Sequence, residues 1–227
     1  MSAGPKGRLA RAAVALQYRL GPRLASALRR RLVRLRNPQA DIRFGGGCYL
    51  GPGFSLHMPH GGTFVAGSGT EFRRGFRAEV AGPDASVRIG AGCYLTYDVI
   101  VACSTSIEIG DRVGIGQAGF VVDGSHRYSD LTRPFLDQGY DYRPLKIASD
   151  AQIHSKVTVM ADIGERAIVG ANAVVTRPVP PFTVAAGVPA RVIDYYGPPG
   201  GEPEGWESTG GESAGREPGL PGDGAAR

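Results

Sequence analysis

Aliphatic side chains recur every six residues through the middle of this 227-residue chain. An α-helix repeats about every 3.6 residues and a strand every two, so neither produces this period. A coil with three short flat faces does, because one aliphatic side chain from each face points inward. Each rung can bury its apolar side only by stacking on the next, so the pattern predicts an all-β, parallel β-helix. The periodic residues are Ile89, Leu95, Val101 and Ile107, then Ile109, Ile115 and Val121, then Ile147, Ile153 and Val159, and finally Ile163, Val169 and Val175.

The composition agrees with this interpretation. The chain holds 35 glycines, which suit the tight corners of such a coil, whereas collagen would need glycine at every third position. It has no apolar run of about 18 residues, so we expect no transmembrane helix. The three cysteines, Cys48, Cys93 and Cys103, form no Cys-x-x-Cys pair. We expect them to be small buried thiols in a reducing compartment, which favours the cytoplasm.

Positive charge is concentrated in an N-terminal arm, residues 1–36. The arm holds ten of the 26 Lys and Arg residues and no acid. Residues 8–36 predict two short helices, split at Gly21-Pro22, of which the second is amphipathic. Two interpretations stay open: the arm lies on an anionic membrane surface, at the inner face, or its helix caps the open end of the coil. The leucines that form one side of the second helix are Leu24, Leu28, Leu32 and Leu35.

The coil is expected to occupy residues 37–196, with two interruptions. Two near copies of one motif lie 45 residues apart, which is not a multiple of six, so the phase must shift between them, around residues 57–77. Residues 122–146 have no periodicity and predict a loop that leaves the coil; such loops in regular domains are usually functional. Gly, Pro, Glu and Ser dominate residues 197–227, which predicts a disordered acidic tail.

Histidine is the side chain best suited to proton transfer near pH 7, and the chain has four. His57 and His60 flank a proline in the first interruption and are expected to be exposed loop residues. His154 is expected to face solvent or an interface. His126 stands where a rung gives way to the long loop, in the segment 122–128. A neutral imidazole there can take a proton from a hydroxyl group, which is the task of a general base in acyl transfer.

The stretch from Ile109 to Ile193 resembles the left-handed β-helix acyltransferases, the hexapeptide-repeat family. Within that family it is similar to the branch of galactoside, maltose and polysaccharide O-acetyltransferases. The residues that carry the resemblance are Ile109-Gly-Asp-Arg-Val-Gly-Ile-Gly116, Asp123-Gly-Ser-His126, Arg133-Pro134, Gln138-Gly-Tyr140, Val169-Gly-Ala-Asn-Ala-Val-Val-Thr-Arg-Pro-Val-Pro-Pro181 and Ala185-Ala-Gly-Val-Pro-Ala-Arg-Val-Ile193.

The resemblance implies a left-handed coil, a homotrimer, and an acyl-CoA bound in the groove between two subunits. His126 matches the family's catalytic histidine, with nearby donors for the oxyanion. In the galactoside branch an Asn-x-Asn motif contacts the acceptor, and Thr96-Tyr97-Asp98 stands at those positions here. We therefore expect acceptor contacts from Thr96, Asp98 and Asp123 with an acceptor other than a galactoside. The residues that match CoA contacts are Ser155, Ala171, Thr176, Arg177 and Arg191.

The chain departs from the family pattern at two places near the CoA groove. The family usually has Val-Trp-Ile-Gly in the coil after the loop, whereas residues 151–154 read Ala-Gln-Ile-His. The segment from Val159 to Ile163 is two residues shorter than a hexad. Both changes predict a reshaped channel for CoA.

These observations predict an O-acetyltransferase that uses acetyl-CoA, needs no metal, and acts on a hydroxyl of a sugar or cell-envelope glycan precursor. Two alternatives remain: N-acylation of an amino sugar, and a non-catalytic trimeric scaffold. A γ-type carbonic anhydrase would need three histidines converging on zinc, and only His126 and His154 lie near the late coils. No base-stacking or groove-reading element is found, so no nucleic-acid partner is expected.

Overall fold

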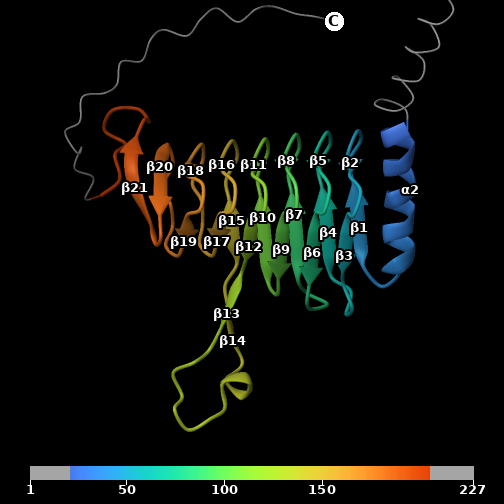
Figure 1. Ribbon diagram of the computed structural model, residues 1–227, viewed down its shortest axis with the longest axis horizontal. Coiled ribbons are helices and arrows are strands. Elements are labelled where there is room, and N and C mark those ends of the chain that lie inside the picture. Colours follow the sequence, from blue (N-terminus) through green and yellow to red (C-terminus); the bar gives the residue numbers. More distant parts are fainter. Residues whose placement is uncertain (1–20, 205–227) are drawn as a thin grey trace, which may run out of the picture.

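The structure is a computed structural model and describes residues 21–204. The chain winds into a three-sided prism whose faces are parallel sheets (Figure 1). The β1 face holds β1 (Asp41–Phe44), β4 (Thr63–Ala66), β7 (Ser86–Ile89), β10 (Ser106–Ile109) and β15 (Leu145–Ile147). The β2 face holds β2 (Tyr49–Leu50), β5 (Glu71–Phe72), β8 (Tyr94–Leu95), β11 (Gly114–Ile115), β16 (Gln152–Ile153), β18 (Ile168–Val169) and β20 (Thr183–Gly187), and ends with the antiparallel β21 (Ala190–Tyr195). The β3 face holds β3 (Ser55–His57), β6 (Arg77–Val80), β9 (Ile100–Cys103), β12 (Phe120–Val122), β17 (Thr158–Val159) and β19 (Val174–Val175). Successive coils are in register, so the predicted parallel β-helix is confirmed.

The aliphatic residues that recur every six positions fill the centre of the prism. Leu95, Val101 and Ile107, one from each face of a single coil, have no exposed surface. Neighbouring coils align these positions, since Leu95 pairs with Ile115 across the β2 face. Burial of this aliphatic row is the main favourable contribution to the fold, because every rung removes apolar surface from the next.

The coils shorten along the chain. Phe44 lies in register with Ala66, so an early coil has 22 residues, whereas Ile147, Ile163 and Val179 stack through single bridges, so each late coil has 16. The wide end is filled by stacked aromatic rings and the narrow end by alanine and valine; the rings belong to Phe54, Phe64, Phe72 and Phe76. The short segment after Val159 therefore replaces the β1-face strand by a bridge.

The extra residues of the early coils lie at the corner between the β3 and β1 faces. They are residues 58–62 in one coil and 81–85 in the next. The first segment falls inside the range 57–77 that the sequence indicated. The second falls outside it, because two corners rather than one interruption produce the offset of 45 residues.

The corners on either side of each β2-face strand hold a residue with positive φ. In the early coils glycine supplies it, as at Gly69 (φ 71°) and Gly75 (φ 81°). In the later coils other residues take the same position, including Asp98 (φ 58°), Arg112 (φ 56°) and Asp150 (φ 61°). These corner side chains stack along the prism edge, so the carboxylate of Asp150 accepts hydrogen bonds from Nε and Nη2 of Arg112, each 2.7 Å long.

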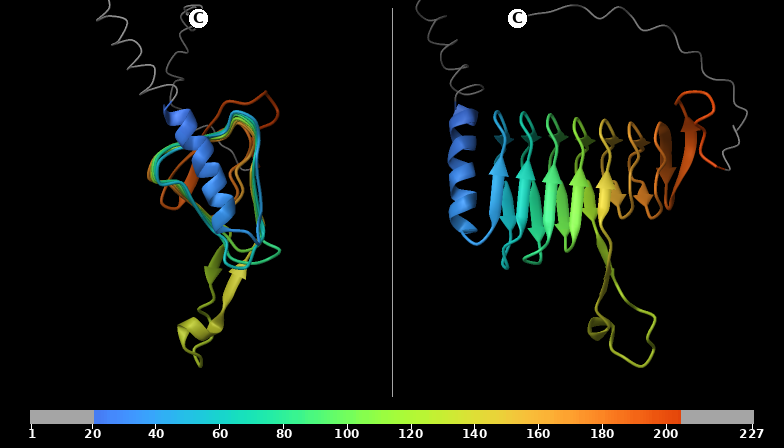
Figure 2. Two further views of the ribbon diagram at one scale, coloured as in Figure 1. Left: turned by 90° about the vertical axis from the view of Figure 1, so that its right-hand side faces the viewer. Right: turned by 180° about the vertical axis from the view of Figure 1, so that it is seen from behind.

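Helix α2 (Gly21–Arg36) lies across the N-terminal end of the prism (Figure 2). Its buried residues are Ser26 and Val33. The Leu50 amide donates to the hydroxyl oxygen of Ser26 (2.8 Å), and Arg29 donates to the Leu50 carbonyl (2.7 Å). The helix therefore provides hydrogen-bond partners for backbone groups at the exposed edge of the first coil. Helix α2 thus covers the N-terminal end of the coil in this structure.

The leucines of α2 do not make the cap. Leu24, Leu28, Leu32 and Leu35 are 69%, 59%, 39% and 75% exposed, on the side of the helix away from the prism. Residues 1–20 of the predicted arm, and residues 205–227 of the predicted tail, lie outside the described residues. No helix within residues 21–204 combines the length and apolar character needed to cross a bilayer.

Candidate functional site

A hairpin leaves the prism directly after β12 and projects away from it (Figure 1). Its strands are β13 (Gly124–His126) and β14 (Tyr140–Tyr142), and the 3-10 turn η2 (Phe135–Gln138) lies near the tip. The segment matches the interruption that the sequence indicated. The Gln138 amide donates to the carbonyls of Asp130 and Arg133, which ties the tip together.

His126 is the last residue of β13, the first strand of the hairpin. Its ring is packed between Phe135 and Tyr140, with ring centroids 4.9 Å and 4.2 Å away. Nδ1 is buried and has no hydrogen-bond partner among the described residues. Packing therefore sets the ring orientation, and Nε2 is left as the nitrogen that a substrate could reach.

His126 lines a cavity of about 360 Å³ between the hairpin and the β3 face. Prism residues such as Ala102 and Thr158 form one side, and Tyr140 and Tyr142 form the other. The Tyr142 ring lies over Gly124, where an added Cβ would come within 2.2 Å of the ring. Glycine is required there because the aromatic wall of the cavity occupies that space.

Asp123 anchors the base of the hairpin. Only 4% of it is exposed, and its carboxylate accepts hydrogen bonds from the amides of Ser104 (2.9 Å) and Thr105 (2.6 Å) and from the Thr105 hydroxyl (2.9 Å). The Cys103 thiol lies 3.6 Å from the same carboxylate. Asp123 also lines the cavity, but these donors already occupy its oxygens. This arrangement favours a positioning role over the acceptor contact that the resemblance implies.

The Asp123 carboxylate also affects its neighbour Cys103. Burial, then the negative charge of Asp123, raises the pKa of the Cys103 thiol to about 12. Burial likewise raises the pKa of the thiols of Cys48 and Cys93. All three cysteines are buried and free, as the sequence indicated, so none is placed to act as a nucleophile.

A second cavity, of about 320 Å³, lies on the β2 face of the same coils. Its floor is open because Gly114 and Gly116 carry no side chain; an added Cβ would meet Gln152 or the backbone of His154 within 2.5 Å. Thr96 lines this cavity, and its hydroxyl is buried without a partner among the described residues.

The predicted CoA and acceptor residues divide between faces. Ser155 and Ala171 line the β2-face cavity beside Thr96, and Asp98 lies at the corner beyond it. Thr176 and Arg177 lie in the corner after β19, at the far end of the β3 face, and Arg191 lies on β21. Within one chain the structure therefore does not bring His126 together with the other predicted residues, apart from Asp123.

Some residues of these cavities were not anticipated from the sequence. These are Phe135, Tyr140 and Tyr142, which enclose His126. Gln152 and His154, which the sequence indicated beside the CoA groove, line the β2-face cavity. The signal available was the aromatic content of the loop, four Phe and Tyr residues between 122 and 146 in a chain with few aromatics. In residues 21–204 no three His, Cys, Asp or Glu side chains are grouped so that they could hold a metal ion.

No protein-family model matches the chain. Several curated proteins are similar to the chain in sequence. The chain is 36% identical over 98 residues to a probable acetyltransferase, Rv3034c, of Mycobacterium tuberculosis, which covers 42% of this chain and 33% of that protein. It is 31% identical over 100 residues to the galactoside O-acetyltransferase of Escherichia coli (43% and 48% covered). It is 35% identical over 109 residues to WbbJ of Escherichia coli, a putative lipopolysaccharide biosynthesis O-acetyl transferase (43% and 55% covered).

The chain is a relative of the hexapeptide-repeat acetyltransferases. It spans about a third to a half of the length of these curated relatives. Solved structures agree on the fold. AntD, an N-acyltransferase from Bacillus cereus solved with dTDP and 3-hydroxybutyryl-CoA, has a TM-score of 0.57 at 16% identity, over 71% of this chain and 86% of that one. The hexapeptide-repeat acetyltransferase VCA0836 from Vibrio cholerae has a TM-score of 0.51 at 24% identity, over 75% and 80%.

Proposed function

We propose that this protein is an acetyl-CoA-dependent O-acetyltransferase that acts on a sugar or glycan hydroxyl, with His126 as the general base. The observation that carries the proposal is the placement of His126. Its ring is clamped between two aromatic rings at the mouth of a cavity, at the junction of rung and hairpin. The sequence relationship to acetyltransferases supplies the reaction class.

The two cavities favour a shared active site in a homotrimer. The coils that hold His126 on the β3 face hold the β2-face cavity with Ser155 and Ala171. In a three-fold ring of left-handed prisms, one face of each subunit meets a different face of the next, so two half-sites on adjacent faces can combine. The exposed hairpin tip, with Leu131 97% and Leu136 76% exposed, is suited to contact a neighbouring copy.

The chemistry follows from this arrangement. The unprotonated Nε2 of His126 takes the proton of the acceptor hydroxyl as that oxygen attacks the thioester carbonyl carbon. The carbon–sulfur bond breaks, the acetyl group forms an ester with the sugar, and the CoA sulfur receives the proton from the imidazolium. The buried hairpin base at Asp123 supports the strand that carries His126, so the ring needs no reorganisation during the reaction.

The donor groove follows the β2 face in this proposal. Gln152 stands where the family has tryptophan, and it leans over Gly114 in the cavity. Arg177 and Arg191 supply guanidinium groups for the phosphates of the nucleotide end. Arg177 follows β19 and Arg191 lies on β21, so both belong to the C-terminal end of the prism.

The acceptor is the finer part of the proposal. Thr96 and Asp98 are the residues that we propose contact the acceptor. WbbJ, named for lipopolysaccharide biosynthesis, is the reason for proposing a cell-envelope glycan as that acceptor. The anionic inner surface of the cytoplasmic membrane is the further partner, contacted through residues 1–36. The fold similarity to AntD, an N-acyltransferase also solved with dTDP-4-amino-4,6-dideoxyglucose, motivates the inclusion of amino sugars in any acceptor screen.

The test is a screen of sugar and amino-sugar acceptors with acetyl-CoA, followed by release of the CoA thiol. His126→Ala should lower kcat by about 10²–10⁴-fold in a folded protein, because proton transfer by a positioned base contributes this much. His60→Ala is the matched control: it removes an exposed histidine outside both cavities and should leave the rate unchanged. Full activity of the His126→Ala protein would refute the assigned base, and no acetyl transfer or CoA binding with any acceptor would favour a non-catalytic scaffold.

A further inference from the structure

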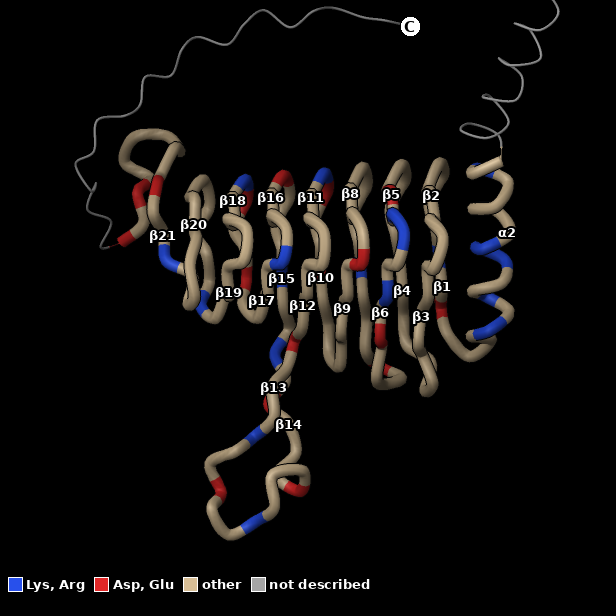
Figure 3. The backbone as a smooth tube through the Cα atoms, viewed as in Figure 1, with Lys and Arg blue, Asp and Glu red and all other residues tan. Residues whose placement is uncertain are grey.

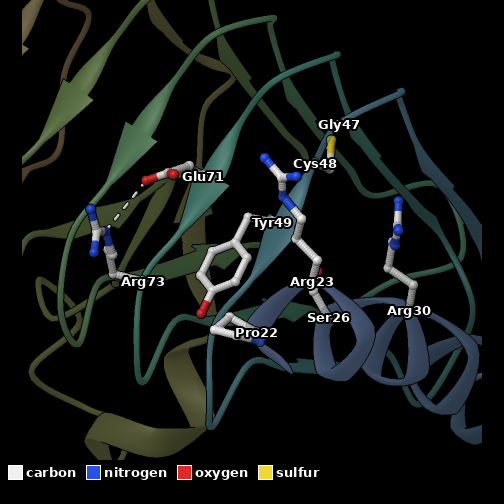
Figure 4. A pocket seen from close by; sticks show the side chains of 9 residues that line it. All are labelled: Pro22, Arg23, Ser26, Arg30, Gly47, Cys48, Tyr49, Glu71 and Arg73. Atoms are coloured by element: carbon white, nitrogen blue, oxygen red, sulfur yellow. Dashed lines mark ion pairs between the residues drawn. The ribbon is translucent and has the colours of Figure 1, made fainter. Parts of the chain in front are cut away.

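A third cavity, of about 650 Å³, lies between helix α2 and the first two coils (Figure 4). It is larger than either cavity described above and is formed by other residues. Arg23 and Arg30 reach into it from the helix, and Glu71 and Arg73 from β5 and the residue after it, around the ring of Tyr49. The acyl-transfer chemistry proposed above uses none of these side chains.

The cavity carries excess positive charge. Glu71 is paired with Arg73 at 3.4 Å, and Arg73 also stacks on the Tyr94 ring, 5.0 Å from its centroid. Among residues 21–204 no ion pair involves Arg23 or Arg30. Helix α2 has no acidic residue, and Figure 3 shows blue but no red segments along it. Two guanidinium groups that have no carboxylate partner among the described residues therefore line the same cavity.

This arrangement suits a phosphate group. A guanidinium group donates paired hydrogen bonds to phosphate oxygens, and two such groups across a cavity match the charge of a phosphate ester. Arg30 and Cys48 both line the cavity, and the charge of Arg30 partly offsets the burial that raises the pKa of the Cys48 thiol. A bound phosphate would occupy the position from which both arginines can reach it.

The exposed side of α2 indicates which kind of phosphate-bearing molecule the cavity binds. Leu24, Leu28 and Leu35 are more than half exposed and point away from the prism. Arginines flank this leucine row on both sides of the helix, which is the pattern of a helix that lies in the interface of an anionic bilayer. A second copy stacked on this side would bring two acid-free, arginine-rich helices together, which their like charge opposes.

We propose that the cavity under α2 binds the phosphate headgroup of an anionic membrane lipid while the leucine row enters the bilayer. The inference rests on the membrane partner proposed above for residues 1–36, and it assigns that partner a site. Because α2 lies across the end of the prism, the prism then stands upright on the membrane (Figure 2). The coil of His126 is the fourth from that end, which places the catalytic cavity roughly 15–20 Å above the surface at the usual strand spacing.

The experiment compares two double variants of the full chain that lose the same charge from the same helix. Arg23→Gln with Arg30→Gln removes the cavity arginines, and Arg31→Gln with Arg36→Gln removes exposed arginines outside it. Co-sedimentation is measured with vesicles of phosphatidylcholine, with and without phosphatidylglycerol. We expect the cavity variant to lose at least about ten-fold more affinity for phosphatidylglycerol vesicles than the control variant, because bulk attraction is equal for both.

A second measurement separates lipid phosphate from free phosphate. Glycerol phosphate at fixed ionic strength should raise the Tm of the natural chain and not of the cavity variant. Leu24→Ser with Leu28→Ser should keep this Tm shift and lose vesicle binding. Acetyl transfer to a soluble acceptor should be unchanged in every variant, so this inference and the proposed enzyme activity can fail separately.

Several results would overturn the proposal. Equal affinity of the two arginine variants would mean that bulk charge, not a site, holds the protein on the membrane. A Tm shift without any vesicle binding by the natural chain would assign the cavity to a soluble phosphate. A concentration-dependent doubling of the assembly that the leucine variant loses would assign the leucine row to a second copy.

Discussion

At the scale of single residues, the carboxylate of Asp123 joins the hairpin to the prism. It accepts hydrogen bonds from two backbone amides and a hydroxyl while almost fully buried. Asp123→Asn would turn a side-chain amide toward an N–H group and leave at least one donor unsatisfied. We expect the free energy of unfolding to fall by about 1–3 kcal/mol, measured by urea denaturation.

The Asp123→Asn variant has a second, independent readout. The charge of Asp123 contributes to the raised pKa of the Cys103 thiol, so the thiolate absorbance of this residue should appear at lower pH in the variant. Asp84→Asn, a change at an exposed corner residue, should alter neither property. An unchanged thiol titration would show that burial alone controls Cys103.

The buried thiols also predict how stability depends on pH. The folded state keeps the pKa of Cys103 near 12, whereas an exposed thiol titrates near its ordinary value of 9.0. Above that ordinary value the unfolded chain binds fewer protons than the folded one, so the free energy of unfolding should fall as pH rises, by up to about 1.4 kcal/mol per pH unit from this thiol. Urea midpoints between about pH 8 and about pH 11 test this. Cys103→Ala should reduce the slope, and an equal slope in that variant would assign the loss to other groups.

At the scale of elements, the corner positions determine how the chain turns from face to face. Gly69 has φ of 71° and open space around it, so Gly69→Ala isolates the backbone effect. The left-handed conformation costs an alanine about 1–2 kcal/mol, and a less flexible unfolded chain offsets about 0.4–1 kcal/mol of that. We expect a net destabilisation of about 1 kcal/mol in urea unfolding.

The matched control for this corner is Gly46→Ala. Gly46 also has open space around it, but its φ is not positive. The substitution should be neutral or slightly stabilising, because only the unfolded state loses freedom. Equal effects of the two substitutions would mean that the corner tolerates alanine and that glycine is not needed there.

At the scale of the whole molecule, the separation of the two cavities predicts a functional trimer. Light scattering should give three times the chain mass of 23.8 kDa. Leu131→Ser with Leu136→Ser, at the exposed hairpin tip, should weaken the trimer or lower kcat, since the hairpin is expected to reach the neighbouring copy. Leu35→Ser makes the same change at an equally exposed site on α2 and should leave both unchanged. A monomer that transfers acetyl groups at the full rate would contradict the shared site.

Periodicity was sufficient to predict the prism. A six-residue aliphatic period can be buried by only one kind of coil, so the sequence determined the parallel β-helix, the interior row and the presence of a long loop at residues 122–146. That this loop forms a hairpin was visible only in the structure. Local motif position likewise singled out His126, because a histidine where a rung becomes a loop is visible in one dimension. The exposed corners were predictable as a class, from their glycines.

Only the tertiary structure decided which side chains meet. Asp123 is tied to Ser104 and Thr105 of the preceding coil, a contact between coils that no local pattern encodes. The leucine row of α2 is exposed because the helix docks through Ser26 and Val33; amphipathicity identifies an apolar side but not the surface that covers it. Stacking of coils also placed Thr96 beside the β2 face and the cavity of His126 beside the β3 face, because a side chain's face depends on the number of residues in every corner before it.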